Sequence, residues 1–179
     1  MEAYFDNSAT TIVTDSVKDI VVKTMTEDFG NPSAMHMVGV KAEKYIKEAQ
    51  ENIAKILKVD PKEIFFTSGG TESNNMAIIG TAMANKRKGN RIITTSVEHS
   101  SVLATMKYLE EQGFEVIYLP VDRYGVVQME ALEKEMTEDT ILVSTMYVNN
   151  EVGAIEPVGK IGQYIKKVNL PMLVTSIIV

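Results

Sequence analysis

The chain has 179 residues, a length that suits one domain or one domain with part of another. Hydrophobic residues make up 45% and charged residues 23% of the chain, which is typical of a globular protein and excludes disorder throughout. The net charge is −6, and the only tight basic cluster, Lys86–Arg87–Lys88, is interpreted as a helix end, so nucleic-acid binding is not expected. The absence of cysteine and the presence of only two histidines, His36 and His99, exclude disulfides, thiolate metal sites and multi-histidine metal sites within this sequence.

Neither a membrane span nor a signal peptide is predicted. No apolar run approaches the roughly 20 residues that cross a bilayer as a helix. The first residues, Met1–Asp6, lack the basic start and the apolar segment of a secretory signal. We therefore expect a cytoplasmic protein that is not bound to a membrane.

Apolar periodicity and turn residues predict alternating helices and strands. The first helix runs from Thr14 or Asp15 to about Asp28, and the second from about Val40 to Leu57. A short strand over Glu63–Thr67 then leads into a helix that ends near Lys86. The later elements are a strand over Arg91–Ser96, a helix over Ser100–Gln112, a strand over Glu115–Leu119, a helix within Val126–Met136, a strand over Thr140–Val148, a helix over Ile161–Val168 and a strand over Met172–Val179. This alternation indicates a largely parallel α/β sheet, which places ligands at the carboxyl ends of its strands.

The loop Thr67–Asn75 is the first candidate site at such a strand end. Two glycines allow a tight turn before a helix, so free backbone N–H groups and the positive end of the helix dipole face one point, which suits a phosphate. The loop is not a Walker loop, because no Gly-Lys-Ser/Thr follows. An ordinary strand-to-helix turn, with Thr71 as the cap and Asn74 in a capping role, is an equally open interpretation.

Two further loops offer different chemistry. His99 lies between a predicted strand and a predicted helix, where its flat ring could stack on a planar cofactor or act as an acid or base; a histidine hydrogen-bonded to the neighbouring backbone is the alternative. Asn149 and Asn150 follow a buried strand, and one of them could donate to a ligand oxygen, with turn chemistry as the alternative. His36 is interpreted as a loop histidine. Together the three strand-end loops indicate a phosphorylated aromatic cofactor.

At these residues the sequence resembles a known family. The resemblance rests on five motifs, in the same order as in the family, which are Phe5–Thr11, Gly30–Ser33, Thr67–Asn75, Glu98–Val102 and Asn149–Gly153. They resemble those of the cysteine desulfurases of the nitrogenase and iron–sulfur-cluster type, which use pyridoxal 5′-phosphate (PLP) and belong to the class-V aminotransferase superfamily of fold type I. The resemblance extends from residue 4 to about residue 173.

The resemblance implies roles for four residues. Gly70 and Thr71 would bind the cofactor phosphate, His99 would stack on its pyridine ring and help to move protons, and Asn150 would bond its phenolic oxygen. The implied reaction removes sulfur from L-cysteine, giving L-alanine and an enzyme persulfide. The sulfur then passes to an iron–sulfur scaffold or another acceptor protein, and family members are homodimers.

The resemblance also implies a three-layer PLP-transferase large domain over residues 15–179, preceded by an arm, residues 1–14, that packs on the small domain. The large domain would be incomplete, because the Schiff-base lysine and the catalytic cysteine of the family lie beyond the residues matched here. We therefore expect a truncated enzyme that is inactive alone and binds PLP weakly or not at all. A related PLP enzyme, such as a selenocysteine lyase or an aminotransferase, and a non-catalytic partner of a full-length homologue are the alternatives.

Overall fold

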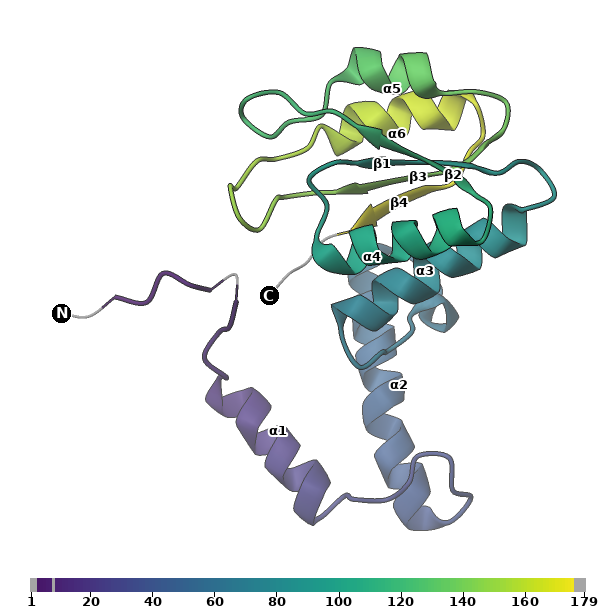
Figure 1. The fold of residues 1–179 in the computed structure, drawn as a ribbon. Helices are drawn as coiled ribbons and strands as arrows, with labels where there is room; N and C mark the ends of the chain where they lie inside the picture. Colours follow the sequence, from purple (N-terminus) through teal and green to yellow (C-terminus); the bar gives the residue numbers. More distant parts are fainter. Residues whose placement is uncertain (1–2, 8, 176–179) are drawn as a thin grey trace. The chain divides into compact units, whose positions relative to one another are not determined.

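The computed structural model describes residues 3–7 and 9–175 and divides the chain into two compact units, the first ending at Phe66 and the second beginning at Thr67 (Figure 1). Among the described helices, none is both long enough and apolar enough to cross a membrane. The predicted division into an arm, 1–14, and a large domain, 15–179, stays a prediction.

The first unit consists of α1 (Asp15–Thr26), α2 (Met37–Leu57) and a 3₁₀ turn, η1 (Pro61–Glu63). Thr14, one of the two residues at which the sequence predicts the start of this helix, is the N-cap residue of α1. The second helix starts earlier than predicted, because His36 caps it: its Nδ1 accepts a hydrogen bond from the Gly39 N–H at 3.2 Å. His36 therefore has a local structural role, in line with its interpretation as a non-catalytic histidine.

Polar contacts join the end of α1 to α2. The buried carboxylate of Asp28 accepts a hydrogen bond from the Tyr45 hydroxyl at 2.6 Å and pairs with the Lys41 ammonium at 2.5 Å. These two groups, Lys41 first, hold the pKa of Asp28 below its ordinary value, and Asp28 raises the pKa of Lys41. The contacts order the loop that leaves α1.

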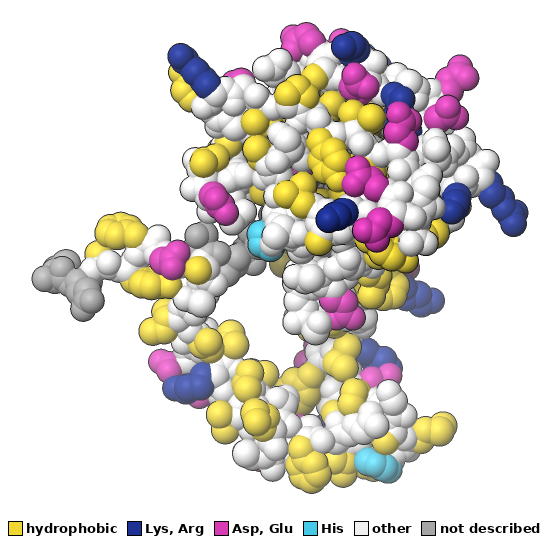
Figure 2. Space-filling view, viewed as in Figure 1, with side chains coloured by type: hydrophobic (Ala, Val, Ile, Leu, Met, Phe, Trp, Pro, Cys, Tyr) yellow, Lys and Arg dark blue, Asp and Glu magenta, His cyan; other side chains and the backbone are white. Residues whose placement is uncertain are grey.

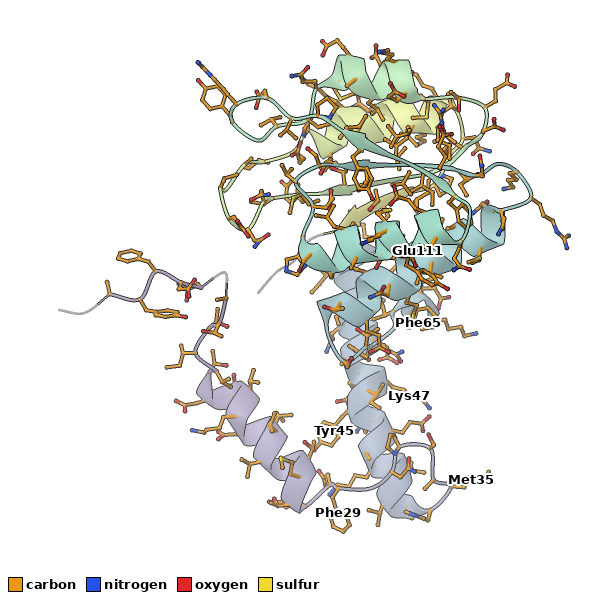
Figure 3. All side chains as sticks on the ribbon, viewed as in Figure 1. Phe29, Met35, Tyr45, Lys47, Phe65 and Glu111 are labelled. Atoms are coloured by element: carbon orange, nitrogen blue, oxygen red, sulfur yellow. The ribbon has the colours of Figure 1, made fainter. Side chains whose placement is uncertain are left out.

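The apolar side chains of the first unit are largely exposed. No residue of α1 is buried, and only Gly39 and Ala54 of α2 are. Phe29 and Met35 project from the loop after α1 with 69% and 100% of their surface exposed (Figure 3). Hydrophobic side chains accordingly gather on the surface of this unit (Figure 2).

The second unit is built on a parallel sheet. Its strands are β1 (Arg91–Thr95), β2 (Glu115–Leu119), β3 (Thr140–Met146) and β4 (Met172–Thr175), in the order β2-β1-β3-β4. Every pairing is parallel. The predicted largely parallel sheet is thus confirmed, although residues 176–179 of the last predicted strand lie outside the described residues.

Helices cover both faces of this sheet and complete three layers. The helices α3 (Gly70–Asn85) and α4 (Ser100–Glu111) lie on one face, and α5 (Met129–Glu135) and α6 (Val158–Lys167) on the other (Figure 1). Neighbouring strand residues point to opposite faces. Ile92 accordingly packs with α3 and α4, whereas Ile93 packs with α5 and α6. Because both faces of the sheet are covered, β1 and β3 consist almost entirely of apolar residues, threonine and serine.

The predicted strand over Glu63–Thr67 is wrong. Glu63 ends the 3₁₀ turn, and the following residues are not paired with any strand in the described part of the chain. Phe65 and Phe66 are 74% and 53% exposed, and Figure 3 labels Phe65. A strand needs a neighbour to satisfy its backbone groups, so an apolar run without one remains only an extended segment.

Candidate functional site

A pocket of about 560 Å³ lies at the carboxyl ends of the strands in the second unit. It is formed by loops that follow three strands, as expected for an open parallel sheet. Its lining residues are Val97, Glu98, His99, Ser100, Arg123, Tyr124, Gly125, Asn149, Asn150, Glu151 and Val152. Two of the predicted site residues, His99 and Asn150, are therefore brought together.

His99 is the N-cap residue of α4 and is half-buried. Its Nδ1 accepts a hydrogen bond from the Ser101 N–H at 3.2 Å and lies 2.9 Å from the Ser101 hydroxyl oxygen. The alternative of a histidine bonded to the adjacent backbone thus describes one edge of the ring. The ring also lines the pocket, so it remains available to a ligand.

The two neighbouring amides have separate structural positions. Asn149 is buried, and its Nδ2 donates to the Val97 carbonyl at 2.9 Å. Its Oδ1 accepts from the N–H groups of Glu151 and Val152, each at 2.9 Å. Asn150 is exposed, and within the described residues its side chain has no hydrogen-bond partner. Turn chemistry thus accounts for Asn149, and Asn150 is the amide left free for a ligand.

Two buried glutamates hold the loops that form the pocket. The Oε1 of Glu98 accepts from the Thr95 hydroxyl at 2.8 Å and from the Met146 N–H at 2.7 Å, which ties the end of β1 to the end of β3. The Oε2 of Glu156 accepts from the Val127 N–H at 2.9 Å. Burial, reinforced by the charge of Asp122 and opposed by the Val127 N–H, raises the pKa of Glu156.

Sequence reasoning missed these two glutamates as structural residues. The sequence singles out Glu98 only as part of a motif and does not single out Glu156. Glu98 stands close to a predicted strand end and next to His99, whereas Glu156 lies eight residues beyond the predicted strand that ends at Val148. An acidic side chain in a loop is normally solvated. Only the tertiary partners, Met146 and Val127, reveal their roles.

The predicted phosphate loop opens α3. Gly69 is the N-cap residue and no side chain caps the helix, so the interpretation in which Thr71 is the cap is wrong. A Cβ on Gly69 or Gly70 would meet nothing within 4 Å, so packing in this chain does not require glycine at either position. Bare backbone and uncapped N–H groups at a helix N-terminus suit the close approach of an anion.

A carboxylate shares this loop. Glu72 Oε2 accepts from the Ser68 N–H and hydroxyl, each at 2.6 Å, and these bonds lower the pKa of Glu72. The loop therefore already satisfies one negative group through Ser68. The N–H groups of Gly70 and Thr71 have no partner among the described residues and remain for a second one.

Hydrogen bonds connect the start of α3 to His99. Asn74 Nδ2 donates to the Ser101 hydroxyl oxygen at 3.0 Å, and that oxygen lies beside the His99 ring. Asn74 therefore bonds across to α4, and does not have the capping role considered for it. Gly70 and Thr71 are joined to the pocket through this link but do not line it.

The side chains and backbone groups at these loops fit a phosphorylated aromatic ligand. Backbone N–H groups at α3 suit a phosphate, the His99 ring offers a flat face, and the Asn150 amide offers a donor. Over the residues that the structure describes, no three His, Asp or Glu side chains are placed to hold a metal ion.

Comparisons with known proteins agree with this chemistry. The sequence model of the family described as aminotransferase class-V matches residues 3–176. Cysteine desulfurase IscS of Clostridium botulinum (strain Hall) is 47% identical over 169 residues, which make up 94% of this chain and 43% of the relative. Cysteine desulfurase IscS 1 of Archaeoglobus fulgidus is 48% identical over 162 residues, which make up 90% of this chain and 42% of that relative.

Solved structures give the same result. A NifS-like protein superposes with a TM-score of 0.92 at 46% identity, over 97% of this chain and 48% of its own. A structure described as SspA in complex with cysteine superposes with a TM-score of 0.90 at 37% identity, over 96% and 49% of the two chains. The chain thus spans less than half the length of the curated relatives it matches.

Proposed function

The chain belongs to the class-V aminotransferase family, and we propose that it is the N-terminal part of a PLP-dependent cysteine desulfurase. The reaction removes sulfur from L-cysteine, giving L-alanine and a persulfide on an enzyme cysteine. The proposal includes a cytoplasmic location. It also includes a homodimer and an iron–sulfur scaffold or other protein as the sulfur acceptor, both of which the family resemblance implies.

The observation that carries the proposal is the meeting of His99 and Asn150 in one pocket at the sheet edge. A flat ring beside a free amide donor is the arrangement that a hydroxylated aromatic ring would require. Relatives named cysteine desulfurase, at 47% and 48% identity, support sulfur removal as the chemistry.

Each proposed residue has one task. The N–H groups of Gly70 and Thr71 would bind the phosphate of PLP, His99 would lie against its ring, and Asn150 would donate to its phenolic oxygen. When bound, PLP supplies an electron sink for the reaction. Glu98 and Asn149 hold the loops that carry the ring and the amide.

This chain alone is not expected to release sulfur. The sequence contains no cysteine, so no persulfide can form on it. We also expect weak PLP binding or none, measured as visible absorbance that remains after dialysis. Retained absorbance, or alanine released from cysteine by the chain alone, would contradict this expectation.

The proposed function is tested in a chimaera. Residues 4–173 replace the matching segment of the Clostridium botulinum relative, and alanine release from L-cysteine is measured. His99→Asn is expected to lower kcat/KM by about 100-fold, since a group that donates to a reacting centre has an effect of this size. His36→Asn is the matched control, because asparagine also caps helices. A folded chimaera that binds PLP but releases no alanine would refute the proposal, as would equal effects of the two substitutions.

A further inference from the structure

Two groups of Ser101, its backbone N–H and its hydroxyl, converge on one nitrogen of His99. The Ser101 N–H donates to Nδ1 at 3.2 Å, and the Ser101 hydroxyl oxygen lies 2.9 Å from the same atom. That oxygen also accepts a hydrogen bond from Asn74 Nδ2 at 3.0 Å. Because Asn74 uses a lone pair of the hydroxyl, the single hydroxyl proton is free to point at the ring.

The backbone settles the direction of this chain of hydrogen bonds. A hydroxyl can donate or accept, but a backbone N–H can only donate. With the Ser101 N–H aimed at Nδ1, that nitrogen must keep its lone pair, and the ring proton of a neutral histidine lies on Nε2. Ser101 is buried, with 8% of its surface exposed, so water competes little for these bonds.

We propose that Ser101 and Asn74 are positioning residues that hold His99 as its neutral Nε2–H tautomer, so that the ring faces the pocket as a hydrogen-bond donor and not as a base. The relevance of this inference to catalysis rests on the proposed function, because the tautomer defines which hydrogen bond the ring offers to a bound cofactor. Of the acid and base roles considered for His99, the proposal keeps the acid role and removes the base role. In the neutral ring, the nitrogen without a partner among the described residues has no lone pair to accept a proton.

His36 provides an internal comparison. It too is an N-cap residue whose Nδ1 accepts a backbone N–H, from Gly39 at 3.2 Å. In the described part of the chain, no hydroxyl supports that nitrogen, and His36 is exposed. The proposal therefore predicts that the Nε2–H tautomer is more dominant in His99 than in His36.

The test is an NMR measurement on the ¹⁵N-labelled chain. The spectra are recorded at a pH about two units above the ordinary histidine pKa of about 6.5, and the ¹⁵N shifts of each ring report which nitrogen carries the proton. The chain has only two histidines, so His36→Asn assigns both sets of signals. For His99 we expect a protonated Nε2 and an unprotonated Nδ1.

Substitutions isolate the hydroxyl. Ser101→Ala keeps the backbone N–H and removes the hydroxyl. The ratio of the Nε2–H to the Nδ1–H tautomer of His99 should therefore fall about fivefold, the factor that one neutral hydrogen bond contributes. Asn74→Ala should shift the ratio in the same direction, and Ser101→Thr should restore it. Ser100→Ala is the matched control, because Ser100 occupies the same helical turn and its hydroxyl does not bond the ring.

A proton on Nδ1 of His99 in the unsubstituted chain overturns the proposal, whether or not any variant folds. An unchanged ratio in Ser101→Ala, with α4 intact by its backbone amide shifts, overturns it as well. The measurement needs no cofactor. A chain with the expected tautomer that never binds PLP in the chimaera would therefore refute the proposed function and leave this inference standing.

Discussion

In α4, Val102, Met106 and Leu109 are fully buried, whereas in α1 Val17, Ile20 and related residues remain about half exposed. Both helices have apolar residues at helical spacing. The sheet of the second unit offers α4 a surface to pack on. The described residues of the first unit offer α1 no such surface.

This contrast shows what a periodic pattern can and cannot indicate. Apolar periodicity identifies the face of a helix that can be buried, but another element must pack against that face to bury it. In the second unit that element is the sheet, and in the first unit the contacts between helices are mainly those of Asp28, Tyr45 and Lys41. The stability of this chain should therefore depend on the second unit.

The largest expected difference lies in the same substitution made in both units. Leu142 is fully buried in β3, and Leu142→Ala should lower the free energy of unfolding by about 3 kcal/mol, because it removes apolar contacts and leaves a cavity. Leu57 is 60% exposed at the end of α2, and Leu57→Ala should change it by less than about 0.5 kcal/mol. Urea unfolding followed by circular dichroism measures both, and similar losses would break the comparison.

The next difference separates the adjacent amides within the second unit. Asn149→Ala should cost about 2 kcal/mol, because it leaves the Val97 carbonyl and the N–H groups of Glu151 and Val152 without their partner. Asn150→Ala should cost less than about 0.5 kcal/mol. In the chimaera the order should reverse for PLP affinity among folded proteins. Equal losses of stability would show that Asn150 is also structural.

The smallest expected effect is a dependence of stability on pH, and it differs between two buried carboxylates, Glu156 in the second unit and Asp28 in the first unit. The pKa of Glu156 is raised in the folded chain, mainly by burial, so its contribution to stability is present below the ordinary glutamate pKa and is lost as pH rises through the folded value. Glu156→Gln keeps an acceptor for the Val127 N–H and removes the charge. It should stabilise the chain at pH 7 and have no such effect at low pH. Unfolding curves at both pH values measure this, and a gain that is equal at both would contradict it.

Asp28 should respond in the opposite direction. Its pKa is lowered by Lys41 and Tyr45, so its contribution is present above the ordinary aspartate pKa and is lost as pH falls through the folded value. The NMR signals of Tyr45 should therefore change at acidic pH, and Asp28→Asn should remove this change. A Tyr45 response that persists in the variant would assign it to another group.

The sequence predicts most of the second unit, because alternating helices and strands leave few possible topologies. It does not predict that Ile64, Phe65 and Phe66 stay unpaired, since an apolar run specifies an extended chain and not its neighbour. It also misses His36 as a helix cap, because histidine is not among the residues that caps favour. Each miss depends on a partner that local sequence does not name.

For the site too, the sequence predicts what local pattern specifies and misses what depends on a distant partner. The rule of carboxyl strand ends correctly places His99 and Asn150 together. The chemistry of the two residues alone leaves open which amide is free, because this depends on the position of the Val97 carbonyl in another loop. Only the family resemblance singles out Asn150. The phosphate role of Gly70 and Thr71 stays a prediction, since these residues lie outside the lining of the pocket.

The strand order β2-β1-β3-β4 also sets a sequence of events during synthesis. The ladder between β1 and β2 can form as soon as β2 has left the ribosome, and β3 then adds on the other side of β1. Until β4 follows, β3 is an edge strand of seven residues, all of them buried in the finished fold. Unpaired, apolar strand edges attract other chains. Between the synthesis of β3 and that of β4, the unpaired edge of β3 is therefore open to pairing with other chains.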